Sequence, residues 1–332
     1  MIDTIYVESD VTLHPRTLEI LQRYPRARVI EIDNYRSIFN RRRQNFRVQK
    51  ARPALIIANK SSPRLHDVPV DQHIGAPHNY YFSHLLNCPF DCRYCFLQGM
   101  FSSANYVLFV NYEDFVDDIR AVCAGHLGIV HLFSGYDCDS LAMEPLTQFA
   151  AYFLDAVKSI ENAVLELRTK STQIRTLLSR PAHTHCVIAM SLSPDPIAAN
   201  VEHGAPSLRE RLNALRRLQD HGWPIGLRFD PLIAILDHSA VYEQFFDQVF
   251  SQLSADSVHS VTVGELRLPR QFAKRMFRLY PDEPLFAAKY NDIDGTFVFS
   301  GENNSGLLDS TLNLLQRHIA QEKIFNQTAS IN

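Results

Sequence analysis

The sequence predicts an α/β protein: a partial parallel barrel of about six strand–helix units, (β/α)6, with a small N-terminal α/β cap. Two observations carry this prediction. From residue 79 onward, short apolar runs alternate with amphipathic helical stretches, and polar side chains follow the ends of the apolar runs. Such alternation implies parallel strands with helices outside, in a partial barrel or an open sheet. We adopt the barrel, in which reactive residues follow the strand ends.

The composition is that of an ordinary packed protein, with 332 residues, 46% hydrophobic and 21% charged. No apolar run reaches the length of a membrane span, and the opening "MIDTIYVESD" lacks the pattern of a signal peptide. We therefore expect a cytoplasmic protein with reduced thiols and no membrane partner. The net charge of −3 means that any nucleic acid must be bound by a local basic patch.

The predicted cap covers residues 1–58. Strands are expected at "TIYVES", "ARVIEI" and "PALIIA", and a helix at "PRTLEILQRY", which Pro15 opens. Residues 41–52, "RRRQNFRVQKAR", contain six basic residues and no acid, which is typical of a solvated surface segment or of a phosphate-contacting face. Residues 59–78 have no period and are rich in Pro, Ser, His and Gly, which indicates a linker or covering loop.

The barrel is expected over residues 79–300, followed by a C-terminal helix and tail over 301–332. Its strands are predicted at "NYYFSHLL", "GIVHLFS", "AVLELRT", "HCVIAMSL", "PIGLRFD" and "SVTVGEL". Its helices are predicted at "YEDFVDDIRAVC", "EPLTQFAAYFLDAVKSI" and "SLRERLNALRRLQDHG". The last helix opens with Ser207 and Glu210 in capping-box spacing and is followed by Gly222.

Polar residues recur where these strands end, which is where parallel barrels carry their active sites. They are the cysteine loop, residues 134–139, Lys170, Ser191, Ser193, Arg228, Asp230, Glu265 and Arg267. Each alone is typical of a solvated loop or a structural ion pair, and their recurrence at one edge predicts an active site.

Three cysteines lie within "NCPFDCRYCFLQG": Cys88, Cys92 and Cys95. Three thiolates of one tight loop can hold three irons of a 4Fe–4S cluster and leave the fourth iron open, where S-adenosylmethionine can chelate it. An electron from the cluster then releases a 5′-deoxyadenosyl radical. The alternative is a structural zinc site with His84 as the fourth ligand.

The Cys-x-x-x-Cys-x-x-Cys spacing, with Tyr94 before the last cysteine, resembles the radical S-adenosylmethionine superfamily. Within it, "CRYCFLQG" followed by "YVLFVNYEDF" resembles the spore photoproduct lyase family, which repairs a thymine dimer in ultraviolet-damaged DNA. The similarity extends from "IYVESDV" through "LELRTKS", "VIAMSLSP" and "VEHGAPSLRERLNALRRLQDHGWPIG". Cys123 and Cys186 stand alone in apolar surroundings and are expected in the core.

The resemblance implies a radical SAM barrel and assigns roles to individual residues. Lys170 and Ser191 would contact S-adenosylmethionine, as we also expect of Ser134, and Tyr94 would lie near the adenine or the substrate. Damaged DNA and an electron donor such as flavodoxin or ferredoxin would be the partners. The oligomeric state is not implied.

The chain departs from the family pattern in three places. Phe96 replaces a tyrosine proposed to relay a hydrogen atom, and Tyr136 occupies the position of the hydrogen-donating cysteine in "FSGYDCDS". Cys138 lies two residues on, and either Tyr136 or Cys138 is a candidate donor. The C-terminal hairpin, basic in the family, carries Asp292 and Asp294 here.

These observations predict a spore photoproduct lyase-like enzyme that repairs a thymine photoproduct in DNA. Two alternatives stay open: a radical enzyme acting on an RNA base, a nucleotide or a peptide, and a zinc-stabilised nucleic-acid-binding protein without catalysis.

Overall fold

The computed structural model describes residues 2–69, 72–235, 237–299 and 306–327 of the chain. Its main sheet contains eight strands within these ranges, in the order β18-β14-β13-β11-β10-β9-β5-β4. All neighbouring pairs are parallel except the edge pair of β4 and β5. The strands, in chain order, are β4 (Leu65–Asp67), β5 (His78–Phe82), β9 (Val130–Ser134), β10 (Ala163–Thr169), β11 (Cys186–Ser191), β13 (Ile225–Leu232), β14 (Val258–Glu265) and β18 (Ile324–Asn326).

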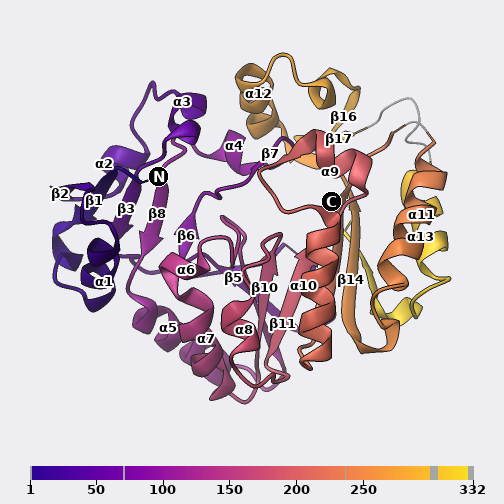
Figure 1. Cartoon of the computed structure of the whole chain (residues 1–332), viewed down its shortest axis with the longest axis horizontal. Coiled ribbons are helices and arrows are strands. Elements are labelled where there is room, and N and C mark those ends of the chain that lie inside the picture. The colour runs from indigo at the N-terminus through magenta and orange to yellow at the C-terminus, as the bar shows by residue number, and fades with distance from the viewer. Residues whose placement is uncertain (1, 70–71, 236, 300–305, 328–332) are drawn as a thin grey trace.

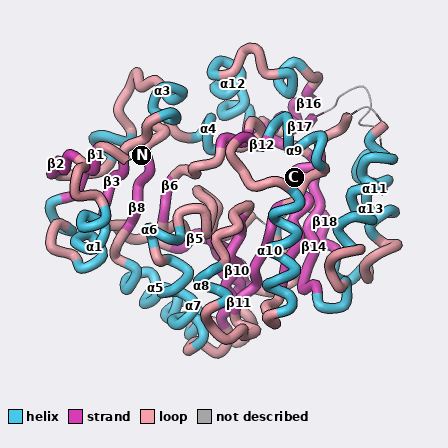
Figure 2. The backbone as a smooth tube through the Cα atoms, in the orientation of Figure 1, coloured by secondary structure: helices cyan, strands magenta, loops and turns pink. Residues whose placement is uncertain are grey.

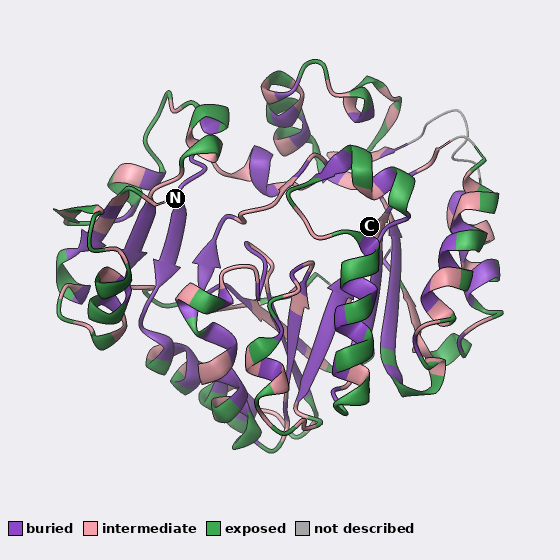
Figure 3. Cartoon of the chain, viewed as in Figure 1, coloured by how far each residue is buried: buried purple, intermediate pink, exposed green. Residues whose placement is uncertain are grey.

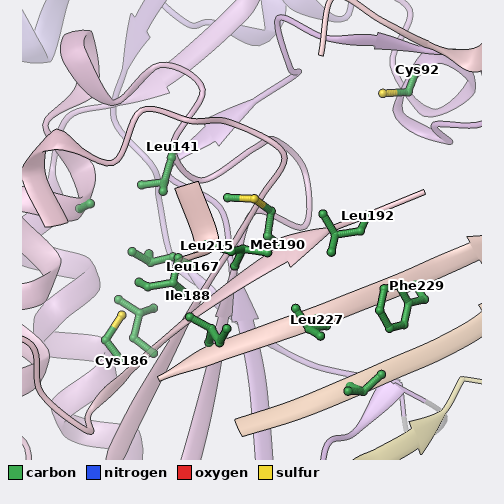
Figure 4. Packing of buried hydrophobic residues seen from close by; sticks show 14 of the residues in the cluster. Cys92, Leu141, Leu167, Cys186, Ile188, Met190, Leu192, Leu215, Leu227 and Phe229 are labelled. Carbon is green, nitrogen blue, oxygen red and sulfur yellow. The ribbon is translucent and has the colours of Figure 1, made fainter. Parts of the chain in front are cut away.

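Helices cover the outer face of this curled sheet (Figure 1). Alternation along the strands turns Leu167, Ile188 and Leu227 toward the helices, where Leu215 packs against the sheet (Figure 4). Figure 3 shows that the central strands of the main sheet are largely buried and that a covering helix such as α10 has a buried face and an exposed face. The covering helices are α5 (Tyr112–Ala124), α7 (Phe149–Lys158), α8 (Arg175–Leu178), α10 (Leu208–Asp220), α11 (His238–Phe250) and α13 (Leu307–Leu315). The predicted partial barrel is confirmed.

Local signals set the helix boundaries. Helix α10 begins after Ser207, whose side chain accepts a hydrogen bond from the backbone of Glu210 while Glu210 caps in return, so the predicted capping box is present. The helix predicted over residues 144–160 is instead two helices, α6 (Glu144–Thr147) and α7. Gln148 between them adopts a left-handed conformation, φ 48°, which interrupts the helix.

The N-terminal sheet is larger than the sequence predicts. Its order is β2-β1-β3-β8-β6, so two strands that flank the cysteine loop join the three strands of the cap. The five strands are β1 (Thr4–Glu8), β2 (Arg28–Ile32), β3 (Leu55–Ala58), β6 (Leu85–Leu86) and β8 (Tyr106–Phe109). The cap therefore does not end at residue 58 in space, because β8 pairs in parallel with β3. Helices α1 (Pro15–Arg23), α2 (Arg36–Phe39) and α3 (Phe46–Ala51) complete this unit.

Two other predicted boundaries differ from the structure. The segment 59–78, expected to be a linker or loop, contributes β4 to the edge of the barrel sheet. The C-terminal segment contributes β18, which pairs with β14, while residues 301–305 and 328–332 lie outside the described residues. Such short edge strands give almost no periodic signal, so only tertiary pairing reveals them.

The carboxyl edge of the barrel is covered by short elements (Figure 2). They are β7 (Asp91–Cys92), α4 (Leu97–Met100), α9 (Asp195–Val201), β12 (Glu202–His203), β15 (Arg267–Pro269), α12 (Arg270–Leu279), β16 (Tyr290–Ile293) and β17 (Thr296–Phe299). The last two form the predicted hairpin, turned by Asp294 and Gly295, both at positive φ. None of the helices described is long and apolar enough to span a membrane.

Candidate active site

The cysteine loop lies between β6 and β8, two paired strands of the N-terminal sheet. Asn87, at φ 70°, turns the chain out of β6, and its side-chain amide donates to the carbonyls of Ser103 and Asn105 at 2.8 and 2.7 Å. Cys88 follows directly, and Cys92 lies in β7. The backbone N–H of Cys95 donates to the carbonyl of Cys92 at 3.0 Å, which closes the turn before α4. All three cysteines are free thiols on this one loop.

The three thiols are close enough to affect one another's ionisation. Burial raises the pKa of Cys88 well above its usual value, that of Cys92 to about 12, and that of Cys95. The negative charges of Cys92 and Cys95 raise the pKa of Cys88 further. Three cations lower these pKa values: Lys50 acts on Cys88 and Cys95, Lys170 on Cys92 and Cys95, and Arg211 on Cys92. A group of one buried and two half-buried thiols with compensating cations fits the ligand set of an iron–sulfur cluster.

A single metal ion needs its ligands gathered around one point, whereas the thiolates of an iron–sulfur cluster each bind a different iron. Within the described ranges, no three His, Cys, Asp or Glu side chains form a group that could hold one metal ion. The ring of His84, considered above as a zinc ligand, stacks at 3.6 Å on Phe149 in the core, and burial lowers its pKa to about 3. Cys123 and Cys186 are buried core residues, as expected.

Lys170 stands at the end of β10, beside the cysteine loop. Its ammonium lies 5.4 Å from the centroid of the Tyr94 ring. Burial alone would lower the pKa of Lys170, but the neighbouring Cys92 and Glu202 charges raise it overall. The side chain therefore remains a cation in a largely dry environment, where it can pair with an anionic ligand group.

Glu202 connects the elements around this lysine, and sequence reasoning did not single it out. Strand β12 pairs antiparallel with β7, and Glu202 lies opposite Cys92. Its carboxylate accepts hydrogen bonds from the hydroxyl of Tyr94, from the hydroxyl of Ser193 at 3.1 Å, and from Arg211. Burial would raise the pKa of Glu202, but Lys170 and Arg211 lower it. A single acid in "VEHG" gives no sequence signal, because Tyr94 lies 108 residues away and nothing in the sequence indicates that Ser193 and Arg211 converge on it.

The two candidate serines are placed differently. Ser191 ends β11, and its carbonyl accepts a hydrogen bond of 2.8 Å from Arg211, which ties it to the Glu202 network. Ser134 is buried at the end of β9; its hydroxyl donates to the carbonyl of Glu166 at 2.9 Å and lies 2.8 Å from the Ser140 hydroxyl. The Ser134 hydroxyl is thus occupied by contacts within the protein.

Asp139 fastens the loop after β9 to the end of β10. Its carboxylate accepts the hydroxyl of Thr169 at 2.6 Å, the backbone N–H of Lys170 at 2.7 Å, and the N–H groups of Leu141 and Ala142. Burial raises the pKa of Asp139, although these hydrogen bonds favour its charged form. The backbone of Lys170 is thereby held in place.

The two candidate hydrogen donors lie in different surroundings. The ring of Tyr136 stacks on that of Tyr81 with 4.3 Å between the centroids, and its centroid lies 6.2 Å from that of the Phe96 ring. The Tyr136 hydroxyl donates a hydrogen bond of 2.9 Å to the side-chain oxygen of Gln72. Cys138 instead packs into the core of the N-terminal sheet, with Leu85, and burial raises its pKa well above the usual value. Both were expected to face the cavity of the cysteine loop, and the structure brings Tyr136 beside Phe96 of that motif.

Several of the residues expected at strand ends form ion pairs within the protein, and Arg228 lies inside β13 rather than at its end. Arg228, buried on β13, pairs with Glu166 on β10 at 2.6 Å and donates to the carbonyl of Ser260 at 3.1 Å. Glu166, which sequence reasoning missed, has a lowered pKa because Arg228 and Arg168 outweigh the effect of burial. Asp230 and Arg267 lie 3.4 Å apart. The Arg228–Glu166 pair links β13 to β10 across the intervening β11, and the Asp230–Arg267 pair links β13 to β15.

Lys50, from the basic segment 41–52, reaches the cysteine loop. Its ammonium donates to the carbonyl of Cys88 at 2.5 Å and to that of Phe90 at 2.8 Å. Neither interpretation of the basic segment anticipated this contact. The sequence of a basic run does not show which of its lysines makes such a contact, because the partners of Lys50 lie about 40 residues further along the chain.

Three cysteines on one loop, beside a half-buried lysine at the carboxyl edge of a partial parallel barrel, define a protein of the radical S-adenosylmethionine class. Residues 72–285 match the family model described as spore photoproduct lyase. The chain belongs to the spore photoproduct lyase family, and the family membership predicted from the sequence is confirmed.

The similar proteins agree with this assignment. The curated spore photoproduct lyase of Bacillus subtilis (strain 168) is 22% identical over 177 residues, which are 53% of this chain and 52% of that protein. The chain therefore aligns with about half the length of that relative. A solved spore photoproduct lyase complexed with dinucleoside spore photoproduct is 16% identical, with a TM-score of 0.82 and 99% of each chain covered. A mutant of the lyase with bound AdoMet and the same dinucleoside is 17% identical, with a TM-score of 0.81 and the same coverage. At this identity, both show the same fold.

Proposed function

We propose that this protein is a radical S-adenosylmethionine lyase that repairs the spore photoproduct, a thymine photoproduct in DNA. The observation that carries the proposal is the three-thiol loop beside Lys170 in a chain that belongs to the spore photoproduct lyase family. The fold it shares with a lyase complexed with the dinucleoside lesion supports the choice of substrate.

Cys88, Cys92 and Cys95 would hold a 4Fe–4S cluster, and Lys170 with Ser191 would receive S-adenosylmethionine. When bound, this pair supplies a radical that abstracts a hydrogen atom from the lesion. The protein's own part is to bind and orient. The ammonium of Lys170, kept charged by Cys92 and Glu202, suits the carboxylate of S-adenosylmethionine. Glu202 holds Tyr94 at the cysteine loop and, through Arg211, the end of β11.

A hydrogen atom must return to the product after the bond between the bases breaks, and Tyr136 and Cys138 remain the candidates. The position of Tyr136 beside Phe96 favours Tyr136. In that step the O–H bond of Tyr136 breaks and its hydrogen atom passes to the carbon radical of the product. The tyrosyl oxygen then regains an electron from the flavodoxin or ferredoxin donor and a proton from solvent.

DNA would be held by cations near the carboxyl edge of the barrel. Asp292 of the hairpin pairs with Arg270 at 2.8 Å, so the hairpin's acidity is partly offset. Helix α12 exposes Arg270, Lys274, Arg275 and Arg278. Cations on one face neutralise phosphates, and binding should weaken steeply as salt rises. We propose α12, rather than the hairpin alone, as the phosphate-contacting element.

The decisive experiment is anaerobic turnover with a synthetic dinucleoside spore photoproduct and dithionite as the reductant. We expect thymidine dinucleoside and 5′-deoxyadenosine to form together, and neither to form with the Cys88→Ala protein. Release of 5′-deoxyadenosine without repair would instead support a radical enzyme with another substrate, which the replacement of the family's donor cysteine by Tyr136 favours. Colourless protein with one zinc per chain would contradict both.

A further inference from the structure

Lys50 differs from the other cations around the cysteine loop in the groups that surround its positive charge. Arg211 pairs with Glu202, Arg93 pairs with Asp91 at 2.6 Å, and Lys170 is surrounded by Glu202 and Tyr94. Among the described residues, Lys50 donates only to the carbonyls of Cys88 and Phe90. Within the described ranges, no carboxylate lies in ion-pair distance of Lys50, so its charge is left to act on the thiols.

The position of Lys50 is fixed by helix α3, which is docked onto the segment that follows the cysteine loop. Asn45 caps the helix by accepting from the N–H of Val48 at 3.1 Å, and Phe46 is buried. Next to Lys50, the side chain of Gln49 accepts from the hydroxyl of Ser103 at 3.2 Å and from the N–H of Ala104 at 3.0 Å. Lys50 is therefore held over the loop.

We propose that Lys50 is a positioning residue that sets the reduction potential of the iron–sulfur cluster and clamps the turn between its first two ligands. The proposal rests on the proposed function, because it requires the cluster. A cluster with three thiolate ligands becomes more negative when it takes up an electron. A fixed cation in a partly buried environment stabilises the reduced form more than the oxidised form. Lys50 would thus make the cluster easier for the electron donor to reduce.

The test separates the charge of Lys50 from its hydrogen bonds. Lys50→Gln keeps N–H donors but removes the charge, Lys50→Met removes both, and Lys50→Arg keeps both. Arg52→Met is the matched control, since Arg52 is an exposed cation of the same segment that pairs with Asp3 at 2.9 Å. Each protein is reconstituted anaerobically, its iron is counted, and its midpoint potential is measured by electron paramagnetic resonance during a redox titration without S-adenosylmethionine.

We expect the midpoint potential to become more negative in Lys50→Gln and Lys50→Met, and to stay near the wild-type value in Lys50→Arg and Arg52→Met. Loss of iron from Lys50→Gln with retention in Lys50→Arg would also support the charge. A Lys50→Gln protein with full iron and an unchanged potential would overturn the inference, as would loss of iron from all three variants. Wild-type protein that holds no cluster would instead overturn the proposed function.

Discussion

At the scale of single residues, the site depends on charges kept in dry surroundings. Lys170, Glu202 and Arg211 form one group in which each charge faces an opposite one. Removing one charge of such a group leaves the opposite charge of its neighbour without a partner, so a change at Lys170 affects more than one hydrogen bond.

Lys170→Ala should weaken binding of S-adenosylmethionine by about 1.5–3 kcal/mol, the range for hydrogen bonds to charged groups. Iron content should stay the same, because Lys170 is not a ligand. Equilibrium dialysis with labelled S-adenosylmethionine measures the effect. Lys158→Ala, at the exposed end of α7, is the control. An affinity unchanged in Lys170→Ala would show that the ammonium does not contact the cofactor.

Tyr136 and Cys138 can be distinguished by their products. Tyr136→Phe removes the O–H bond while keeping the stack on Tyr81, so it should still consume S-adenosylmethionine but give aberrant or trapped product. Cys138→Ala, in the core of the N-terminal sheet, should give normal product. Product analysis by chromatography and mass spectrometry decides between them. The reverse result would return the role of donor to Cys138.

At the scale of elements, the contact between α4 and α12 depends on a glycine. A Cβ on Gly99 would lie 2.3 Å from the carbonyl oxygen of Phe272 and 2.7 Å from its Cα, too close for backbone that cannot move aside. Helix α12 lies against the cysteine motif because Gly99 has no side chain. The guanidinium of Arg275 adds a hydrogen bond of 3.2 Å to the Gly99 carbonyl.

Gly99→Ala should lower the free energy of unfolding by about 1–3 kcal/mol, the usual cost of overpacking. Urea denaturation followed by circular dichroism measures it. Gly125→Ala is the control, because a Cβ there meets its nearest atom at 3.4 Å. Equal free energies of unfolding for the two variants would mean that α12 can move away from residue 99 without an energetic cost. The contact with Gly99 would then not fix the position of α12.

The elements also show what a sequence can and cannot reveal. The six long parallel strands and α10 were predictable, because apolar periodicity and the Ser207–Glu210 capping box are local signals. The assignment of β6 and β8 to the N-terminal sheet was not predictable, because the sequence of a short apolar strand does not indicate which strand it pairs with. Likewise, the cysteine spacing predicts the ligands, whereas Glu202 and Lys50 reach them only through tertiary contacts.

At the scale of the whole molecule, two buried histidines predict how stability depends on pH. Burial lowers the pKa of His84 to about 3 and that of His131 to about 4. Below the ordinary histidine pKa of 6.5, the unfolded chain binds protons at these positions while the folded chain does not. The free energy of unfolding should therefore fall as pH drops from 6.5 toward 4.

The expected loss at pH 5 is about 2 kcal/mol for each histidine, from 1.36 kcal/mol per pKa unit. Denaturation curves between pH 7 and 5 measure it. His84→Phe should flatten the dependence, because Phe can keep the stack on Phe149 without a titrating group. An identical pH dependence in His84→Phe and wild type would show that His84 does not contribute.

The sharing of β6 and β8 with the N-terminal sheet has a consequence for shortened forms of the protein. A chain cut after residue 58 would not yield a free barrel, because β8 would lose β3 and expose an unpaired edge. The strands on both sides of the cysteine loop would lose their support at the same time. We expect such a fragment to aggregate and to be removed by proteases rather than to persist as a smaller enzyme.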